Sequence, residues 1–172
     1  PQGLSAEEMA QLVDTAVAQG ADAIITQGIC PVSPLENTIN EGVKVLMVDS
    51  DSADLDGRLA YLGKDLDKQA QLMYEEVAKV IPEDEKIVMS IQCADLTSQF
   101  YVDQNAAVEE AFSQHPGGFE LVNTTLSKSD KATGTNEWLN TFNTYPEVNV
   151  CMNLAAEAAS ACVTAADELG IT

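Results

Sequence analysis

The strongest constraint on the fold is that segments with helical spacing alternate with short apolar runs along the whole chain. The first helical pattern begins with a capping-box candidate, Ser5-Ala6-Glu7-Glu8, and should end at Gly20. The run "VKVLMVD" at 43–49 is apolar at nearly every position, which is typical of a parallel strand covered on both faces. The alternation therefore predicts an α/β fold with parallel sheets and right-handed helical crossovers.

The remaining elements follow from the same criteria of period, length and turn residues. Further strands are predicted at 21–28, 86–92, 119–125 and 148–153. Further helices are predicted at 33–42 (a short one at most), from 65 or 67 to about 80, and at 98–112, 135–142 and 155–170.

Polar residues follow the predicted strands at the point where each strand ends. In parallel sheets ligands bind outside these carboxyl ends. The residues there are Gln27, Asp49-Ser50-Asp51, Gln92-Cys93, Thr124-Thr125 and Asn153. Neutral hydrogen-bonding groups beside a few carboxylates suit a polyhydroxy ligand such as a sugar, and suit a phosphate poorly. Asp49 and Asp51 have an alternative interpretation as turn residues, and Asn153 as a helix cap.

The acidic composition excludes some partners. A formal net charge of −20 repels phosphate backbones and anionic membrane surfaces, so no nucleic-acid partner is expected. No apolar run approaches the roughly 18 residues that a membrane span needs. The chain starts at Pro1 without a Met or a signal peptide, which predicts a processed chain or a fragment.

The chain shows none of the motifs of the common enzyme and cofactor sites. There is no Gly-x-Ser-x-Gly elbow, no Gly-x-Gly-x-x-Gly fingerprint and no Walker loop. The four cysteines form no C-x-x-C pair and there is one histidine, His115, which argues against a zinc site. The cysteines are expected to be buried free thiols, with Cys30 more exposed in a loop. Trp138 is expected to pack in a core. We therefore expect no enzyme activity, no metal and no cofactor.

Several of these segments together resemble a known family. They are "AQLVDTAVAQGADAIITQG", "VKVLMVDSD", "YLGKDLDKQAQLMYEEVAK", "EWLNTFNTYPEVNVCMN" and the helix that follows. In this order they are similar to periplasmic sugar-binding proteins of the ribose- and galactose-binding type, whose fold also serves lac-repressor-like effector domains. The resemblance implies the type 1 periplasmic binding protein fold, in which two hinged Rossmann-like lobes close over a ligand. With the break at Pro82, it implies partial lobes at 1–82 and 83–172.

The resemblance also implies ligand-binding residues. Asp49 matches the sugar-binding Asp of the family, and Asn153 matches its pocket Asn. Gln27 stands where an Asn often faces the ligand, Ser50 stands beside Asp49 where the family carries Arg, and Gln104 stands where another Arg contacts the sugar. The loss of both arginines removes bidentate donors, which argues against a strongly acidic ligand.

The implied function is that of a solute-binding protein that carries a sugar or similar small polar solute to the membrane permease of an ABC-type importer. The alternative is a ligand-sensing domain of a transcriptional regulator or receptor. The implied location is periplasmic or extracellular, with attachment to the bacterial cell surface. Relative to the family, a first strand-helix unit and the last strands are missing. The chain is therefore expected to be truncated at both ends, with open sheet edges that favour self-association.

Overall fold

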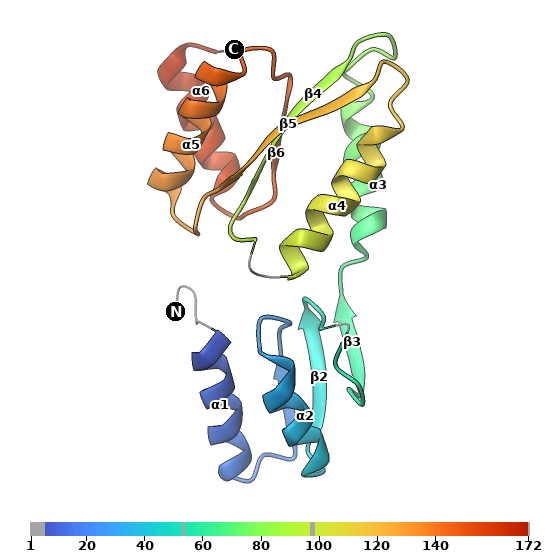
Figure 1. Ribbon diagram of the computed structural model, residues 1–172, viewed down its shortest axis with the longest axis vertical. Helices are drawn as coiled ribbons and strands as arrows, with labels where there is room; N and C mark the ends of the chain where they lie inside the picture. The colour runs from blue at the N-terminus through green and yellow to red at the C-terminus, as the bar shows by residue number, and fades with distance from the viewer. Residues whose placement is uncertain (1–5, 53, 97–98, 172) are drawn as a thin grey trace. The chain divides into compact units, whose positions relative to one another are not determined.

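The computed structural model describes residues 6–52, 54–96 and 99–171, so the predicted cap Ser5 lies outside the described residues. The chain forms two compact units, Pro1–Asp65 and Leu66–Thr172. Each contains a three-stranded, fully parallel sheet with helices packed on it, as the alternating pattern predicts (Figure 1).

The first unit consists of two helices and a sheet of order β1-β2-β3. Its elements are α1 (Ala6–Ala18), β1 (Ala23–Thr26), α2 (Val32–Asn40), β2 (Lys44–Asp49) and β3 (Ala60–Gly63). Gly20 ends the α1 segment with a φ of 84°, a left-handed conformation that glycine adopts at little cost.

The core of the first unit lies on one face of its sheet. Alternate residues of β1 and β2, such as Ile24 and Met47, pack with Val13 of α1 and Leu35 of α2. On the opposite face, Ile25 and Leu62 are 67% and 78% exposed. Only one face of this sheet is therefore covered within the described part of the unit, although the apolar pattern of β2 predicted cover on both faces.

Strand β3 was not predicted, because it carries no burial signal. All four of its residues are exposed, and it forms the edge of the sheet. It pairs with β2 in parallel, with Leu46 opposite Ala60 and Asp49 opposite Gly63. The Tyr61-Leu62-Gly63 segment noted in the sequence is thus an edge strand that ends beside Asp49.

The second unit consists of four helices around a sheet of order β5-β4-β6. Helices α3 and α4 cover one face of the sheet, and α5 and α6 cover the other (Figure 1). The elements are α3 (Leu66–Val77), β4 (Ile87–Cys93), α4 (Gln99–Ser113), β5 (Phe119–Leu126), α5 (Lys131–Thr144), β6 (Val150–Asn153) and α6 (Ala158–Leu169).

Strand β4 is buried on both faces and separates two cores. Met89 and Ile91 point towards α3 and α4, where they pack with Phe112. On the other face, Trp138 of α5 is fully buried among small residues of α6 and stacks on Phe142 with ring centroids 5.5 Å apart. The prediction that Trp138 is a core residue is confirmed.

The two compact units divide at Asp65–Leu66, whereas the sequence places the lobe boundary at 82–83. The reason is that α3 packs on α4. Tyr74 of α3 meets Phe112 of α4 edge to face, with ring centroids 5.4 Å apart. Pro82 instead starts a turn inside the second unit, where its carbonyl accepts a hydrogen bond from the Glu85 amide.

Two further residues are more deeply packed than the sequence suggested. Cys30 is 2% exposed and packs with Val13 and Leu35, so the expectation of an exposed loop cysteine is wrong. His115 is 4% exposed, and its Nε2 lies 3.0 Å from the carbonyl oxygen of Glu85. It therefore ties the turn after α4 to the segment before β4.

Candidate functional site

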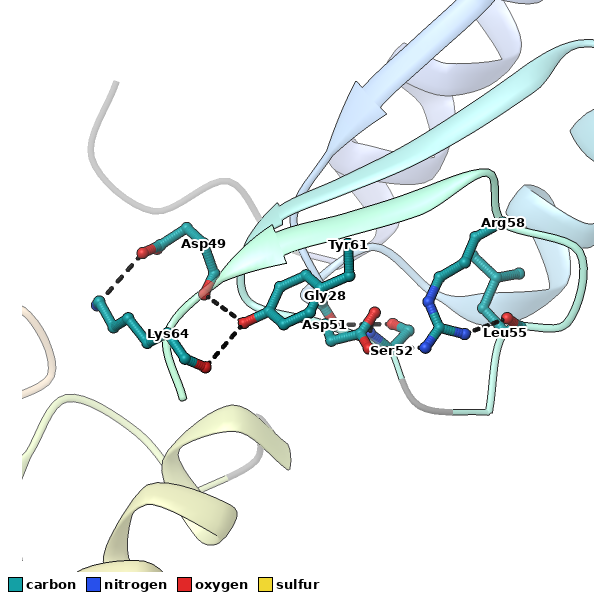
Figure 2. A network of polar contacts seen from close by, with 8 residues as sticks. All are labelled: Gly28, Asp49, Asp51, Ser52, Leu55, Arg58, Tyr61 and Lys64. Carbon is teal, nitrogen blue, oxygen red and sulfur yellow. Dashed lines mark hydrogen bonds and ion pairs between the residues drawn. The ribbon is translucent and has the colours of Figure 1, made fainter. Parts of the chain in front are cut away.

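The polar site of the first unit is centred on Asp49, the last residue of β2. Its side-chain Oδ2 accepts a hydrogen bond of 3.3 Å from Gln27 Nε2, and its Oδ1 lies 3.2 Å from Lys64 Nζ. The Tyr61 hydroxyl donates to the Asp49 carbonyl at 3.1 Å (Figure 2). The side chain is still 49% exposed. The carboxylate is thus oriented from three strand ends and remains accessible.

The backbone of Asp49 adopts a left-handed conformation with a φ of 64°. Few residue types other than Gly, Asn and Asp adopt this region readily. The conformation ends the strand at once, since the next residues turn away from the sheet. Asp49 is therefore both a turn residue and the carrier of an accessible carboxylate, so the two interpretations do not exclude each other.

Asp51 has a different role. Its Oδ2 lies 2.8 Å from Arg58 Nη2, and its Oδ1 accepts a 2.9 Å hydrogen bond from the Ser52 amide (Figure 2). Arg58 Nη1 also donates to the Leu55 carbonyl at 2.7 Å. Both carboxylate oxygens of Asp51 are engaged inside the loop after β2, which supports its interpretation as a turn residue.

Ser50 joins the loops that follow β1 and β2. It is 5% exposed, and its Oγ accepts a 3.0 Å hydrogen bond from the Gly28 amide. The same amide also lies 3.0 Å from the Ser50 carbonyl. Because Gln27 directly precedes Gly28, this junction places Gln27 beside Asp49. Ser50 thus positions the predicted ligand residues in this structure.

We expect Gly28→Ala to destabilise the first unit by about 2 kcal/mol, because a Cβ at this position has no room. That atom would lie 2.0 Å from the Asp51 carbonyl oxygen, so the backbone itself must move. Chemical denaturation of the two proteins measures the loss.

The matched control is Gly42→Ala. Gly42 has a φ of 88°, and no heavy atom of the described residues lies within 4 Å of its would-be Cβ. That variant should lose only the cost of the left-handed backbone, about 1 kcal/mol. A Gly28→Ala variant as stable as the wild type would show that the close approach at Gly28 is unimportant.

In the second unit, Asn153 ends β6 in a half-buried position. Its Nδ2 donates to the Cys151 carbonyl at 3.0 Å, while its Oδ1 is buried with no partner among the described residues. The cap of α6 is Glu157, so Asn153 does not cap that helix. A buried acceptor without a donor destabilises the folded state. A hydrogen bond from a ligand hydroxyl or from water would remove this penalty.

Two adjacent residues of α4 share this property. Gln104 Nε2 lies 3.3 Å from Gln69 Oε1, and Asn105 Nδ2 lies 3.8 Å from Cys93 Sγ, but both side-chain carbonyls are buried with no partner within the described ranges. Sequence reasoning singled out Gln104 and missed Asn105. The available signal was its place next to Gln104, in the second turn of α4.

Other polar residues at the strand ends hold the fold together. Gln92 is fully buried, and its Nε2 donates to the Gly134 carbonyl at 3.0 Å and to Thr125 Oγ1 at 3.3 Å. These contacts tie β4 to β5 and to α5. Gln92 Oε1 is also buried without a partner among the described residues, but the bonds that Nε2 donates hold this side chain between β4, β5 and α5. The candidate ligand groups are therefore Asp49, Gln27, Asn153, Gln104 and Asn105.

Residues 6–52, 54–96 and 99–171 contain no group of three or more His, Cys, Asp or Glu side chains placed to hold a metal ion. Within the same ranges, no helix is long and apolar enough to cross a membrane.

Comparison with known proteins identifies the family. The family described as the periplasmic binding protein domain matches residues 1–172. The chain belongs to this family. Its fold is accordingly the α/β fold of type 1 periplasmic binding proteins, as the sequence implied. The family is one of binding proteins rather than enzymes, and membership implies a bacterial protein that is periplasmic or extracellular.

Solved structures of other binding proteins share the fold at low identity. The glucose-galactose binding protein GanP from Geobacillus stearothermophilus matches with a TM-score of 0.87 and 21% identity, over 99% of this chain and 61% of that one. A solute-binding protein from Burkholderia graminis C4D1M in complex with D-arabinose gives 0.86 and 20%, over 99% and 59%. The myo-inositol binding protein of Caulobacter gives 0.83 and 18%, over 96% and 57%. This periplasmic binding protein domain therefore spans about three fifths of the length of these relatives.

Proposed function

We propose that this chain is the ligand-binding part of a solute-binding protein that takes up a neutral sugar or a related polyol. The observation that carries the proposal is the accessible carboxylate of Asp49, held by Gln27 and Lys64 at the carboxyl end of a parallel strand. A carboxylate in that place accepts hydrogen bonds from vicinal hydroxyls, and hydrogen bonds to charged groups are worth about 1.5–3 kcal/mol.

The second unit has hydrogen-bonding groups of its own. Asn153, Gln104 and Asn105 each keep a buried side-chain carbonyl without a donor in the described part of the chain. Sugar hydroxyls both donate and accept, so they suit carboxylate and amide groups alike. We propose Asp49 and Gln27 of the first unit as ligand-binding residues, and, separately, Asn153 and Gln104 of the second unit. Ser50 positions the loop that carries Gln27.

A neutral ligand fits the charges better than an acidic one. Lys64 is the basic group beside Asp49 and is already paired with it. The overall charge of −20 also repels anions. The structural relatives named above carry D-arabinose or myo-inositol, or are described as binding glucose and galactose, which supports the same class of ligand.

We further propose that the full-length protein is attached to the cell surface and delivers its ligand to the permease of an ABC-type importer. The family to which the chain belongs supports this role. A sensory role would begin with the same binding step and would differ in the partner that recognises the loaded protein.

The test is calorimetric titration of the full-length protein with D-galactose, D-glucose, D-arabinose and myo-inositol, with D-gluconate as the anionic control. We expect saturable binding of at least one neutral ligand and none of gluconate, and a rise in melting temperature with the same ligand. Binding of gluconate alone, or of none of the five compounds, would contradict the proposal.

A further inference from the structure

Asp49 and Asp51, at the end of β2, each have a basic partner. Lys64 Nζ lies 3.2 Å from Asp49 Oδ1, and Arg58 Nη2 lies 2.8 Å from Asp51 Oδ2 (Figure 2). The whole chain has 28 acidic and only 8 basic residues. Two of these few basic side chains thus lie on the two carboxylates at one strand end, and each of these negative charges is matched locally.

The two ion pairs differ in their accessibility. The side chains of Arg58 and Asp51 are 27% and 24% exposed, and Arg58 also donates to the Leu55 carbonyl inside the loop. The side chains of Lys64 and Asp49 are 46% and 49% exposed. A ligand that binds Asp49 therefore meets the Lys64 ammonium, which lies on one of the two carboxylate oxygens.

One hydroxyl holds the backbone on both sides of this ion pair. Tyr61 Oη lies 3.1 Å from the Asp49 carbonyl oxygen and 3.4 Å from the Lys64 carbonyl oxygen (Figure 2). A phenol has a single donor hydrogen, so the two carbonyls share it. The backbones of Asp49 and Lys64 are thereby kept close together, and the ammonium needs only its own side chain to reach the carboxylate.

The tyrosine ring can take this position because residue 63 is glycine. Gly63 lies opposite Asp49 in the register of β2 and β3. A Cβ at position 63 would lie 2.0 Å from Tyr61 Oη and 2.2 Å from Tyr61 Cζ. Glycine therefore admits the ring, the ring hydroxyl reaches Asp49, and Lys64 follows directly in the chain. Residues 61–64 thus place one positive charge beside the proposed ligand carboxylate.

We propose that Lys64 sets the charge preference of this site by excluding cationic ligands such as amino sugars. The inference rests on the function proposed above. An accessible carboxylate in a chain of net charge −20 attracts amines, and the Lys64 ammonium cancels that attraction at Asp49. A carboxylate has about four lone-pair positions, of which Gln27 and Lys64 each occupy one. Asp49 can therefore still accept hydrogen bonds from neutral hydroxyls.

The exclusion does not depend on which carbon of a sugar carries the amine. The screening length at about 0.01 M ionic strength is roughly 30 Å, which is longer than any monosaccharide. Lys64 therefore repels an ammonium group anywhere on a sugar that is bound to Asp49, and it does not repel the neutral parent sugar. The ratio of the two affinities isolates the charge effect from any general change in binding.

The test uses the full-length protein and the neutral compound that binds best in the titration above, together with its monoamine analogue. The analogues are D-galactosamine, D-glucosamine, 2-amino-2-deoxy-D-arabinose and an inosamine. Titrations are run at low ionic strength and about pH 6, where an amine of ordinary pKa is protonated. In Lys64→Gln, which keeps a side-chain donor but loses the charge, the affinity for the amine relative to the neutral parent should rise about three- to tenfold.

The matched control is Lys86→Gln. Lys86 pairs with Glu120 in the second unit, and both side chains are 51% exposed. This variant changes the net charge by the same amount, and its affinity ratio should change less than about twofold, since the lost charge lies outside the first unit. Lys64→Arg keeps the charge and should retain the wild-type ratio.

Added salt should reduce the difference between the wild type and Lys64→Gln. Equal ratios in Lys64→Gln and Lys86→Gln, a failure of Lys64→Gln to bind the amine, or a wild type that prefers the amine to the neutral sugar would overturn the inference. Absence of binding of every neutral compound by the wild type would instead overturn the proposed function, and this inference with it.

Discussion

Replacement of Asp49 by Asn in the full-length protein should weaken sugar binding roughly ten- to a hundredfold, which corresponds to about 1.5–3 kcal/mol. The change removes the charge that strengthens hydrogen bonds from sugar hydroxyls, and it also removes the ion pair with Lys64. Asn tolerates the left-handed backbone at this position, so the turn after β2 should survive. Calorimetric titration of the wild type and the variant measures the loss.

Melting curves separate this effect from a loss of fold. The Asp49–Lys64 pair is half exposed on both sides, and such pairs add little to stability. The variant should therefore melt close to the wild type. The matched control is Asp51→Asn, which breaks the contact with Arg58 inside the loop and should lower the melting temperature more than the affinity. A variant at position 49 with normal affinity and a lower melting temperature would show that Asp49 is only a turn residue.

Truncation of Trp138 to Ala should lower the free energy of unfolding by about 3–5 kcal/mol, the range for large aromatic residues in a core. Trp138 is fully buried and stacks on Phe142 between α5 and α6. The neighbouring residues of α6, Ala161 and Ala165, are too small to fill the cavity. Denaturant unfolding, followed by circular dichroism so that the signal does not depend on the indole, measures the loss.

The control for this prediction is Trp138→Phe. It keeps an aromatic ring against Phe142 and removes an indole N–H that is buried without an acceptor among the described residues. Removal of the unpaired N–H eliminates its desolvation penalty, and this gain offsets part of the free energy lost with the smaller ring. The Phe variant should therefore be much more stable than the alanine variant. Similar losses for both variants would mean that ring volume does not determine the stability of this core.

The features that could be predicted from the sequence are those set by the spacing of apolar and turn residues along the chain. The order of the helices and of all strands except β3, the position of Asp49 at a strand end and the burial of Trp138 follow from periodicity and from residues that break it. Gln27 and Asp49 were each predicted at a strand end, and parallel strands bring such ends together, which accounts for the contact between them in the structure.

Features that depend on contacts between distant segments were not predicted. The exposed edge strand β3 has no burial pattern to reveal it. Helix α3 precedes the break at Pro82, so the sequence places it in the first lobe. In the structure it packs on α4 and belongs to the second unit. Ser50 has a hydroxyl that could bind a ligand, but in the structure this hydroxyl oxygen accepts a hydrogen bond from the Gly28 amide. Asn105 stands in no distinctive sequence pattern, and only the fold buries its side-chain carbonyl without a donor among the described residues.

The positive φ of Asp49 restricts how this site can change during evolution or engineering. A β-branched or bulky side chain at position 49 is a conformational outlier in that backbone region, whereas Asn, Asp and Gly are accepted. The set of functional groups available there is thus limited to a carboxylate, an amide or none. New ligand preferences are therefore easier to obtain at Gln27, which reaches the same carboxylate from a neighbouring strand end.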